Sequence, residues 1–254
     1  MLLILVFSFL QRGTYGGLIW NFSFDNFINV FDPSYFLIIF QSVLLALATT
    51  ILCFIFALPL TWKISSLPAA RKNLFLFLVC LPFFMNSLAR IYGLKLWFHL
   101  DGPLDQLIQI FSLPFDILNW SHSQGLVLFG MTITYLPFMI FPVYAAFEKL
   151  DFSLIEAAED LGAHSFQIFY KVLLPVLKKP ILNGALIVFV PCLGEYLIPD
   201  LLGGAKNMLV GNLTTELFLK SRDWPLGAAL TVVLLVILAV AHKLVGKAVP
   251  GKKL

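Results

Sequence analysis

Two groups of acidic residues stand out in a chain that is otherwise strongly apolar. The segment SLIEAAEDLG, residues 153–162, contains Glu156 and Asp160 close together. Glu195 and Asp200 lie within an apolar run that prolines and a glycine interrupt. A short acidic helix can dock on a partner protein, whereas carboxylates set among apolar residues can bind a cation away from bulk water.

The sequence contains no group of residues suited to bond chemistry. No Ser/His/Asp or HExxH pattern occurs, and GGAKNM at 203–208 lacks both the spacing and the Ser or Thr of a phosphate-binding loop. Cys53, Cys80 and Cys192 lie singly inside apolar runs, without the paired spacing of a metal site. We therefore expect a chain that is not an enzyme and binds no metal.

The composition indicates a protein of the lipid bilayer. Hydrophobic residues make up 60% of the 254 residues, 26 residues are Phe, and only 12% are charged. A soluble core of this size could not bury so much apolar surface, so we expect an all-α integral membrane protein surrounded by lipid. A net charge of +3 is too small to indicate nucleic acid binding.

Five apolar runs are long enough to cross the hydrocarbon core, which takes about 20 helical residues. The predicted spans are residues 35–62, 74–98, 125–147, 181–202 and 226–246. Residues 1–10 form a partial span, only about 15 Å long as a helix. We expect them to be the outer half of a truncated first helix whose assigned start is too late; the alternative is a half-inserted anchor. A completed first helix gives six spans.

Lysine and arginine in the short loops predict the orientation, because cytoplasmic loops carry an excess of them. Most of these residues lie between 63 and 72, in the 148–180 segment and in the C-terminal tail, whereas residues 99–124 have none. The 148–180 segment is therefore expected to be a cytoplasmic loop.

A short capped helix is predicted within that loop. Ser153 and Glu156 have the S-x-x-E spacing of a capping box, and Gly162 suits the left-handed residue that ends a helix. The small Ala157 and Ala158 would let a partner approach closely. The predicted apolar face consists of the residues at helical spacing, Leu154, Ile155, Ala158 and Leu161. A helix of about two turns is unstable alone and needs a partner surface.

The longer stretch EAAEDLGAHSFQIFYKVLLP resembles the EAA loop of ABC importer permeases. The motif positions after E-A-A are Gly162, Val172 (in place of the more usual isoleucine) and Leu174-Pro175. The resemblance implies a six-transmembrane type I ABC importer permease fold. It also implies a coupling helix that seats in a groove of the ATP-binding subunit, with the residues Glu156, Ala157, Ala158, Asp160 and Gly162.

Further segments look like the first permease of spermidine/putrescine importers. They include NSLARIYGLK, TYLPFMIFPVYAAFEKLD and GEYLIPDLLGGAKNMLVGN, and the resemblance runs from about Phe24 onward. It implies a bacterial inner-membrane subunit. The implied partners are a second homologous permease, two ATP-binding subunits, and a periplasmic or lipoprotein polyamine-binding protein. ATP and Mg would be used by the partner ATPase, and this chain would bind no cofactor.

Other functions remain open at this point. Permeases with the same loop carry iron, thiamine or oxyanions, although Glu195 and Asp200 would repel an anion. A secondary transporter or channel is a second class, which the coupling-loop pattern disfavours. A membrane scaffold is a third, and it would not need acids inside the spans.

Ionisable residues inside a span cost about 2.5–3.5 kcal/mol each on insertion scales, so they are candidates for a cargo pathway. Freed carbonyls and carboxylates in a broken helix suit a cation, which favours Glu195 and Asp200. Alternatively, Glu195 is neutralised by Arg90 at a similar depth, and Asp200 only caps a helix end. Cation–π contacts could come from the aromatic residues Tyr196, Tyr135 and Trp97.

Overall fold

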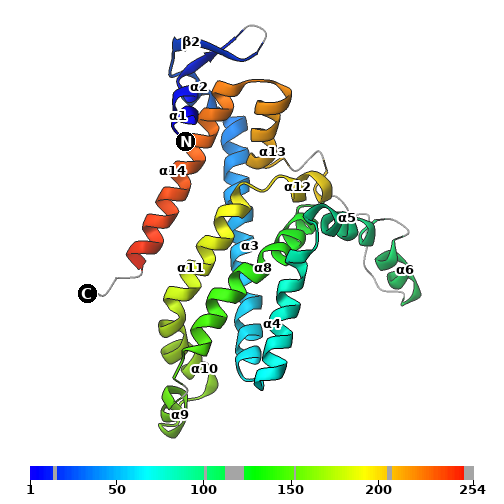
Figure 1. Ribbon diagram of the computed structural model, residues 1–254, viewed down its shortest axis with the longest axis vertical. Helices are drawn as coiled ribbons and strands as arrows, with labels where there is room; N and C mark the ends of the chain where they lie inside the picture. Colours follow the sequence, from blue (N-terminus) through cyan, green and yellow to red (C-terminus); the bar gives the residue numbers. More distant parts are fainter. Residues whose placement is uncertain (14–15, 100–101, 112–122, 152, 205–207, 249–254) are drawn as a thin grey trace.

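The computed structural model shows a bundle of long helices that run along the longest axis of the molecule (Figure 1). The described parts of the chain are residues 1–13, 16–99, 102–111, 123–151, 153–204 and 208–248. Four helices in these parts are long and apolar enough to cross a membrane. They are α3 (Pro33–Ser65), α8 (Gln124–Glu148), the helix over Phe166–Leu193, and α14 (Trp224–Ala248).

The centre of the bundle is α8, which packs against α3 on one side and α11 (Leu174–Leu193) on the other. A Cβ on Gly184 would lie 2.8 Å from the Met139 sulfur, so the missing side chain lets α11 approach α8 closely. Hydroxyl groups inside the bundle donate back to their own helix. Thr50, for example, donates to the Ala46 carbonyl at 2.7 Å. These bonds satisfy polar groups where water is absent.

The single helix predicted for residues 74–98 is corrected to two helices. They are α4 (Ala69–Phe84) and α5 (Ser87–Trp97), which meet at a bend of 95°. Asn86 lies at the bend, and its side-chain oxygen accepts the Leu88 N–H at 2.8 Å. This bond satisfies one of the free backbone N–H groups at the start of α5. An average of hydropathy over the segment does not detect such a helix start.

The span predicted for residues 181–202 is also corrected at both ends. The helix begins earlier, because α10 (Ser165–Ile168) and the π-helical turn η1 (Phe169–Leu173) lead directly into α11. It ends at Leu193, and a separate helix α12 follows after a short break (Leu197–Leu202). The second half of the predicted loop 148–180 is therefore helical, and Glu195 lies outside any helix.

The N-terminal residues form a small unit at the end of the bundle opposite α9 (Figure 1). The predicted partial span 1–10 is observed as α1 (Leu2–Ser8), which packs along α14. An antiparallel hairpin follows, with β1 (Leu10–Arg12) and β2 (Leu18–Phe22), and then α2 (Asp25–Val30). This hairpin is a local exception to the expected all-α structure.

The remaining described elements are α6 (Pro103–Ile110), α9 (Ser153–Asp160), α13 (Val210–Thr215) and the π-helical turn η2 (Glu216–Lys220). α9 lies at the end of the bundle where α3 ends and α4 begins (Figure 1). At this end, Lys72 of α4 forms a 3.6 Å ion pair with Glu148 of α8. The lysine-rich loops and α9 therefore share one end, as the predicted orientation requires.

The fold predicts a clash if Gly211 is replaced by alanine. A Cβ there would lie 2.5 Å from the Glu195 carbonyl oxygen and 2.6 Å from that of Gly194. Because backbone atoms cannot move aside as a flexible side chain can, Gly211→Ala should destabilise the protein by about 1–3 kcal/mol. Thermal unfolding in detergent measures this effect. Gly93→Ala in α5, where no atom lies within 4 Å of the new Cβ, is the matched control and should unfold no earlier than wild type.

Candidate functional site

The N-terminus of α9 is stabilised by Asp151. Its carboxylate accepts the Ser153 N–H at 3.0 Å, and its carbonyl accepts the Leu154 N–H at 3.2 Å. Hydrogen bonds from the hydroxyl and the backbone N–H of Ser153 lower the pKa of Asp151 below its ordinary value. The predicted capping box is therefore wrong, because the N–H that it assigns to Glu156 is taken by Asp151.

The C-terminus of α9 is as predicted. Gly162 has φ +78°, in the left-handed region that glycine adopts without strain. Its N–H donates to the Glu159 carbonyl at 2.8 Å, and the Ala163 N–H donates to the Ala158 carbonyl at 3.0 Å. These two bonds make up a Schellman motif, which ends the helix at a fixed residue.

The predicted apolar face of α9 divides into two parts. Ile155 and Ala158 pack against the buried core of the bundle. Leu154 and Leu161 do not, and Leu161 is 88% exposed. The remaining positions Glu156, Ala157, Glu159 and Asp160 are all exposed. α9 is thus held on one side and presents acidic residues and large apolar residues on the other.

One continuous helical segment connects this end of the protein with the break after α11. It runs from Ser165 to Leu193 through α10, η1 and α11. Ile168 and Leu173, at the start of the segment, are buried. This segment therefore connects the end of the protein that carries α9 with residues 194–196.

Glu195 holds the break between α11 and α12. One carboxylate oxygen, Oε1, accepts the backbone N–H groups of Leu197 at 2.9 Å and Tyr196 at 3.1 Å. The other oxygen, Oε2, accepts the hydroxyl of Tyr135 from α8. The carboxylate therefore satisfies N–H groups that a helix start leaves open, and it joins the break to the central helix.

Arg90 does not form the ion pair with Glu195 that sequence reasoning offered as an alternative. Its guanidinium donates to the Pro82 carbonyl at 3.0 Å, across the bend between α4 and α5. Among the described residues, ion pairs join Arg12 to Asp223 and Lys72 to Glu148, and neither involves Glu195. The Arg90 Nε atom is buried without a hydrogen-bond partner.

The other predicted pathway residues are more dispersed. Asp200 is exposed in the first turn of α12, and the N–H groups at the start of that helix are accepted by Glu195. Tyr196 and Trp97 are both large and exposed, at the break and at the end of α5. Because α12 packs against both α5 and α8, the elements that carry the six candidates are neighbours. Direct contact, however, is shown for Tyr135 and Glu195.

Sequence reasoning assigned no role to two residues that support the break. The Asn212 amide donates to the Tyr196 carbonyl at 2.9 Å, and its Oδ1 atom is buried without a partner. Gly211 lies directly against the backbone of residues 194 and 195. Neither residue is charged or part of a chemical motif, so nothing in the sequence marks them beyond their place in a short polar interruption.

Glu195, which was predicted to lie inside a span, thus lies just beyond the end of the span Phe166–Leu193. The fold and the site define a polytopic membrane protein with an acidic helix at one end and a hydrogen-bonded carboxylate directly after a span. Residues 1–250 match the family model "binding-protein-dependent transport system inner membrane component". The chain therefore belongs to this family of transport permeases and has its all-α membrane fold.

Two relatives are similar over most of their length. The spermidine/putrescine transport system permease protein PotB of Haemophilus influenzae is 41% identical over 241 residues, covering 94% of this chain and 83% of that protein. PotB of Escherichia coli is 37% identical over 237 residues, covering 93% of this chain and 86% of that protein.

Solved structures agree on the fold. A bacterial ABC transporter involved in the import of the acidic polysaccharide alginate has a TM-score of 0.73 at 17% identity, covering 97% of this chain and 88% of that chain. The bacterial alginate transporter in complex with an alginate pentasaccharide-bound periplasmic protein has a TM-score of 0.69 at 17% identity. This match covers 89% of this chain and 82% of that chain.

The geometry of α9 predicts the effect of replacing Gly162. Alanine at φ +78° is strained by about 1–2 kcal/mol, so Gly162→Ala should increase local opening of α9 about 5- to 30-fold. Amide hydrogen exchange over residues 153–163 measures it. Gly162→Asn is the matched control and should stay close to wild type, because asparagine tolerates the left-handed region. Equal exchange in all three proteins would contradict the proposed helix end.

Proposed function

We propose that this chain is a membrane-spanning permease subunit of an ATP-driven, binding-protein-dependent importer of the polyamines spermidine and putrescine. The observation that carries the proposal is the similarity to two polyamine permeases across more than nine tenths of this chain. Two features of the structure support it, a short acidic helix that is exposed at one end of the bundle and a carboxylate directly after the span Phe166–Leu193.

α9 is the coupling helix in this proposal. Its exposed positions, among them Glu156, Ala157 and Asp160, contact the ATP-binding subunit, while Ile155 and Ala158 keep it attached to the bundle. Gly162 fixes where the helix ends, so the segment after it leaves in a defined direction. When the ATP-binding subunit moves α9, the stiff segment from Ser165 onward transmits that movement to the break near Glu195.

The break is the cargo-contact region in this proposal. An extended polycation entering the pathway can exchange its ammonium groups for the Tyr135 hydroxyl on the Glu195 carboxylate. Tyr196, Asp200 and Trp97 supply further aromatic and acidic surface nearby on α12 and α5. Arg90 keeps its bond to the Pro82 carbonyl, so its positive charge does not occupy Glu195.

The partners in this proposal are a second homologous permease, two ATP-binding subunits and a polyamine-binding protein outside the membrane. The sequence has no phosphate-binding loop, so ATP and Mg are bound by the ATP-binding subunits. This chain forms part of the pathway, binds no cofactor and catalyses no reaction.

The coupling role predicts that Glu156→Lys strongly reduces uptake. The substitution inverts the charge of an exposed residue on α9, and like charges brought together at a contact cost several kcal/mol, enough for roughly a tenfold loss or more. Uptake of labelled polyamine in cells that express all subunits measures it, with membrane levels checked by immunoblot. Glu156→Gln removes the charge at similar size and should lose less. Full uptake by Glu156→Lys would refute the coupling role.

The cargo role predicts that Glu195→Gln reduces uptake of spermidine and putrescine. A hydrogen bond to a charged group is worth about 1.5–3 kcal/mol, so uptake at low cargo concentration should fall about 10- to 100-fold. Tyr135→Phe should lose less, because Glu195 keeps its bonds to α12. Transport kinetics in a polyamine-uptake-deficient cell measure both variants.

Two results would speak against cargo contact at Glu195. One is unchanged kinetics in Glu195→Gln. The other is a loss of assembled complex with a normal KM, which would indicate a purely structural acid. Asp25→Asn, which removes a carboxylate from the exposed start of α2, is the control for a general effect of charge.

A further inference from the structure

Five large apolar side chains at the outer end of the protein have no partner in the described structure that covers them. We call them the outer aromatic patch. They are Trp20, Phe22, Phe24, Ile28 and Phe31, and each is at least 65% exposed. They come from β2, from α2 and from the residues next to them. Soluble surfaces rarely expose so many large apolar side chains within so short a segment.

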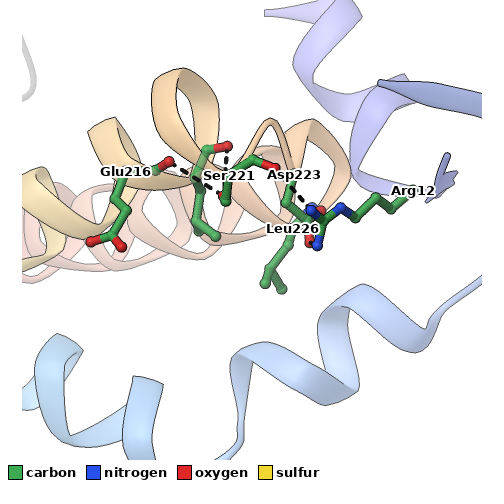
Figure 2. A network of polar contacts seen from close by, with 6 residues as sticks. Arg12, Glu216, Ser221, Asp223 and Leu226 are labelled. Atoms are coloured by element: carbon green, nitrogen blue, oxygen red, sulfur yellow. Dashed lines mark hydrogen bonds and ion pairs between the residues drawn. The ribbon is translucent and has the colours of Figure 1, made fainter. Parts of the chain in front are cut away.

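The hairpin that carries this patch is fixed to the turn before α14, as Figure 2 shows. The Arg12 guanidinium donates to the Ser221 carbonyl at 2.9 Å and pairs with the Asp223 carboxylate at 3.5 Å. The Gly17 N–H donates to the Arg222 carbonyl at 3.2 Å. Gly16 has φ +90°, and a Cβ there would lie 3.0 Å from the Cβ of Arg222. The backbone of the hairpin therefore packs directly against the backbone of this turn.

The base of the hairpin is fixed to α2 in a similar way. The Asn26 amide is buried and donates to the carbonyls of Ser8 at 3.0 Å and Leu10 at 2.7 Å. The Phe9 ring meets those of Phe24 and Phe27 with centroids 5.4 Å and 5.1 Å apart. The hairpin, α1 and α2 thus pack together as one unit. The side chains of the outer aromatic patch lie on the surface of this unit.

The position of α14 gives the depth of this unit in the bilayer. α14 is apolar enough to cross a membrane over Trp224–Lys247, with Lys243 and Lys247 near its inner end. Its outer end begins with Trp224, a residue type enriched at the level of the lipid headgroups. The hairpin is bonded to residues 221–223, immediately before this tryptophan, so it lies at the outer membrane–water interface.

The charge pattern favours lipid as the occupant of the patch. Residues 13–24 contain no charged side chain, and the charge of Arg12 is paired with Asp223. Asp25 and Asp32 flank the rest of the patch, so it carries no basic side chain of its own and only these two acids at its edges. The apolar surface also continues onto its neighbours. Leu2 and Leu3 of α1 and Phe36 at the start of α3 are all more than half exposed, as expected for helices that face hydrocarbon.

We propose that the outer aromatic patch lies in the interfacial region of the outer leaflet, with Trp20, Phe22 and Phe24 among the phospholipid acyl chains near the headgroups. The chemistry is that of an aromatic belt, in which amphipathic and aromatic rings occupy the boundary between hydrocarbon and water. Through the Arg12–Asp223 pair, this contact holds the outer start of α14 at a fixed depth. The proposal does not depend on the identity of the cargo.

Quenching of Trp20 fluorescence by brominated phospholipid tests this directly. The transporter, assembled with its partner subunits, is placed in nanodiscs of phosphatidylcholine with or without bromine at acyl carbons 6 and 7. The signal of Trp20 is the difference between wild type and Trp20→Phe. We expect the brominated lipid to reduce this difference at least about twofold, and bromine at carbons 11 and 12 to reduce it less, because the patch is shallow.

A matched control moves the indole to the other side of the strand. Asn21 follows Trp20 in β2 and bonds to Gln11 at 3.1 Å, so its side chain points to the opposite face. In Trp20→Phe/Asn21→Trp, the new indole should be quenched less than Trp20. A Trp20 signal that brominated lipid leaves unchanged overturns the proposal. Protection of that signal from aqueous acrylamide by added binding protein would also overturn it, and would identify a protein-docking surface.

Discussion

The arrangement of the membrane core depends on the contacts of one carboxylate. The start of a helix leaves backbone N–H groups without a partner inside that helix, and such groups are costly when nothing satisfies them. Glu195 accepts such groups at the start of α12 with one oxygen and the Tyr135 hydroxyl with the other. The same acid thus ties the connection between α11 and α12 to α8.

The two ends of the protein are stabilised by different means. At the inner end, α9 is held by a few side chains and by backbone bonds around Gly162, so that its acidic side stays exposed. At the outer end, residues distant in sequence are locked together by Arg12 and Asn26.

Much of the architecture could be predicted from local properties. Apolar runs gave the regions of α3, α8 and α14, and the distribution of lysine gave the end at which α9 lies. The helix end at Gly162 was predicted because a left-handed residue is a property of a single position. The bend at Asn86 and the early start before α11 were missed, since a hydropathy average cannot distinguish one long helix from two that each satisfy their own ends.

The sequence by itself determined that this is a membrane protein of helices with a short acidic helix in one of its loops, because composition and periodicity act over neighbouring residues. Only the tertiary structure decided which groups meet. Glu195 pairs with Tyr135, 60 positions away, and leaves Arg90 to a carbonyl; Arg12 reaches Asp223 across 211 positions. These choices follow from where broken helices cross and how closely Gly184 and Gly211 let them approach, which no local pattern specifies.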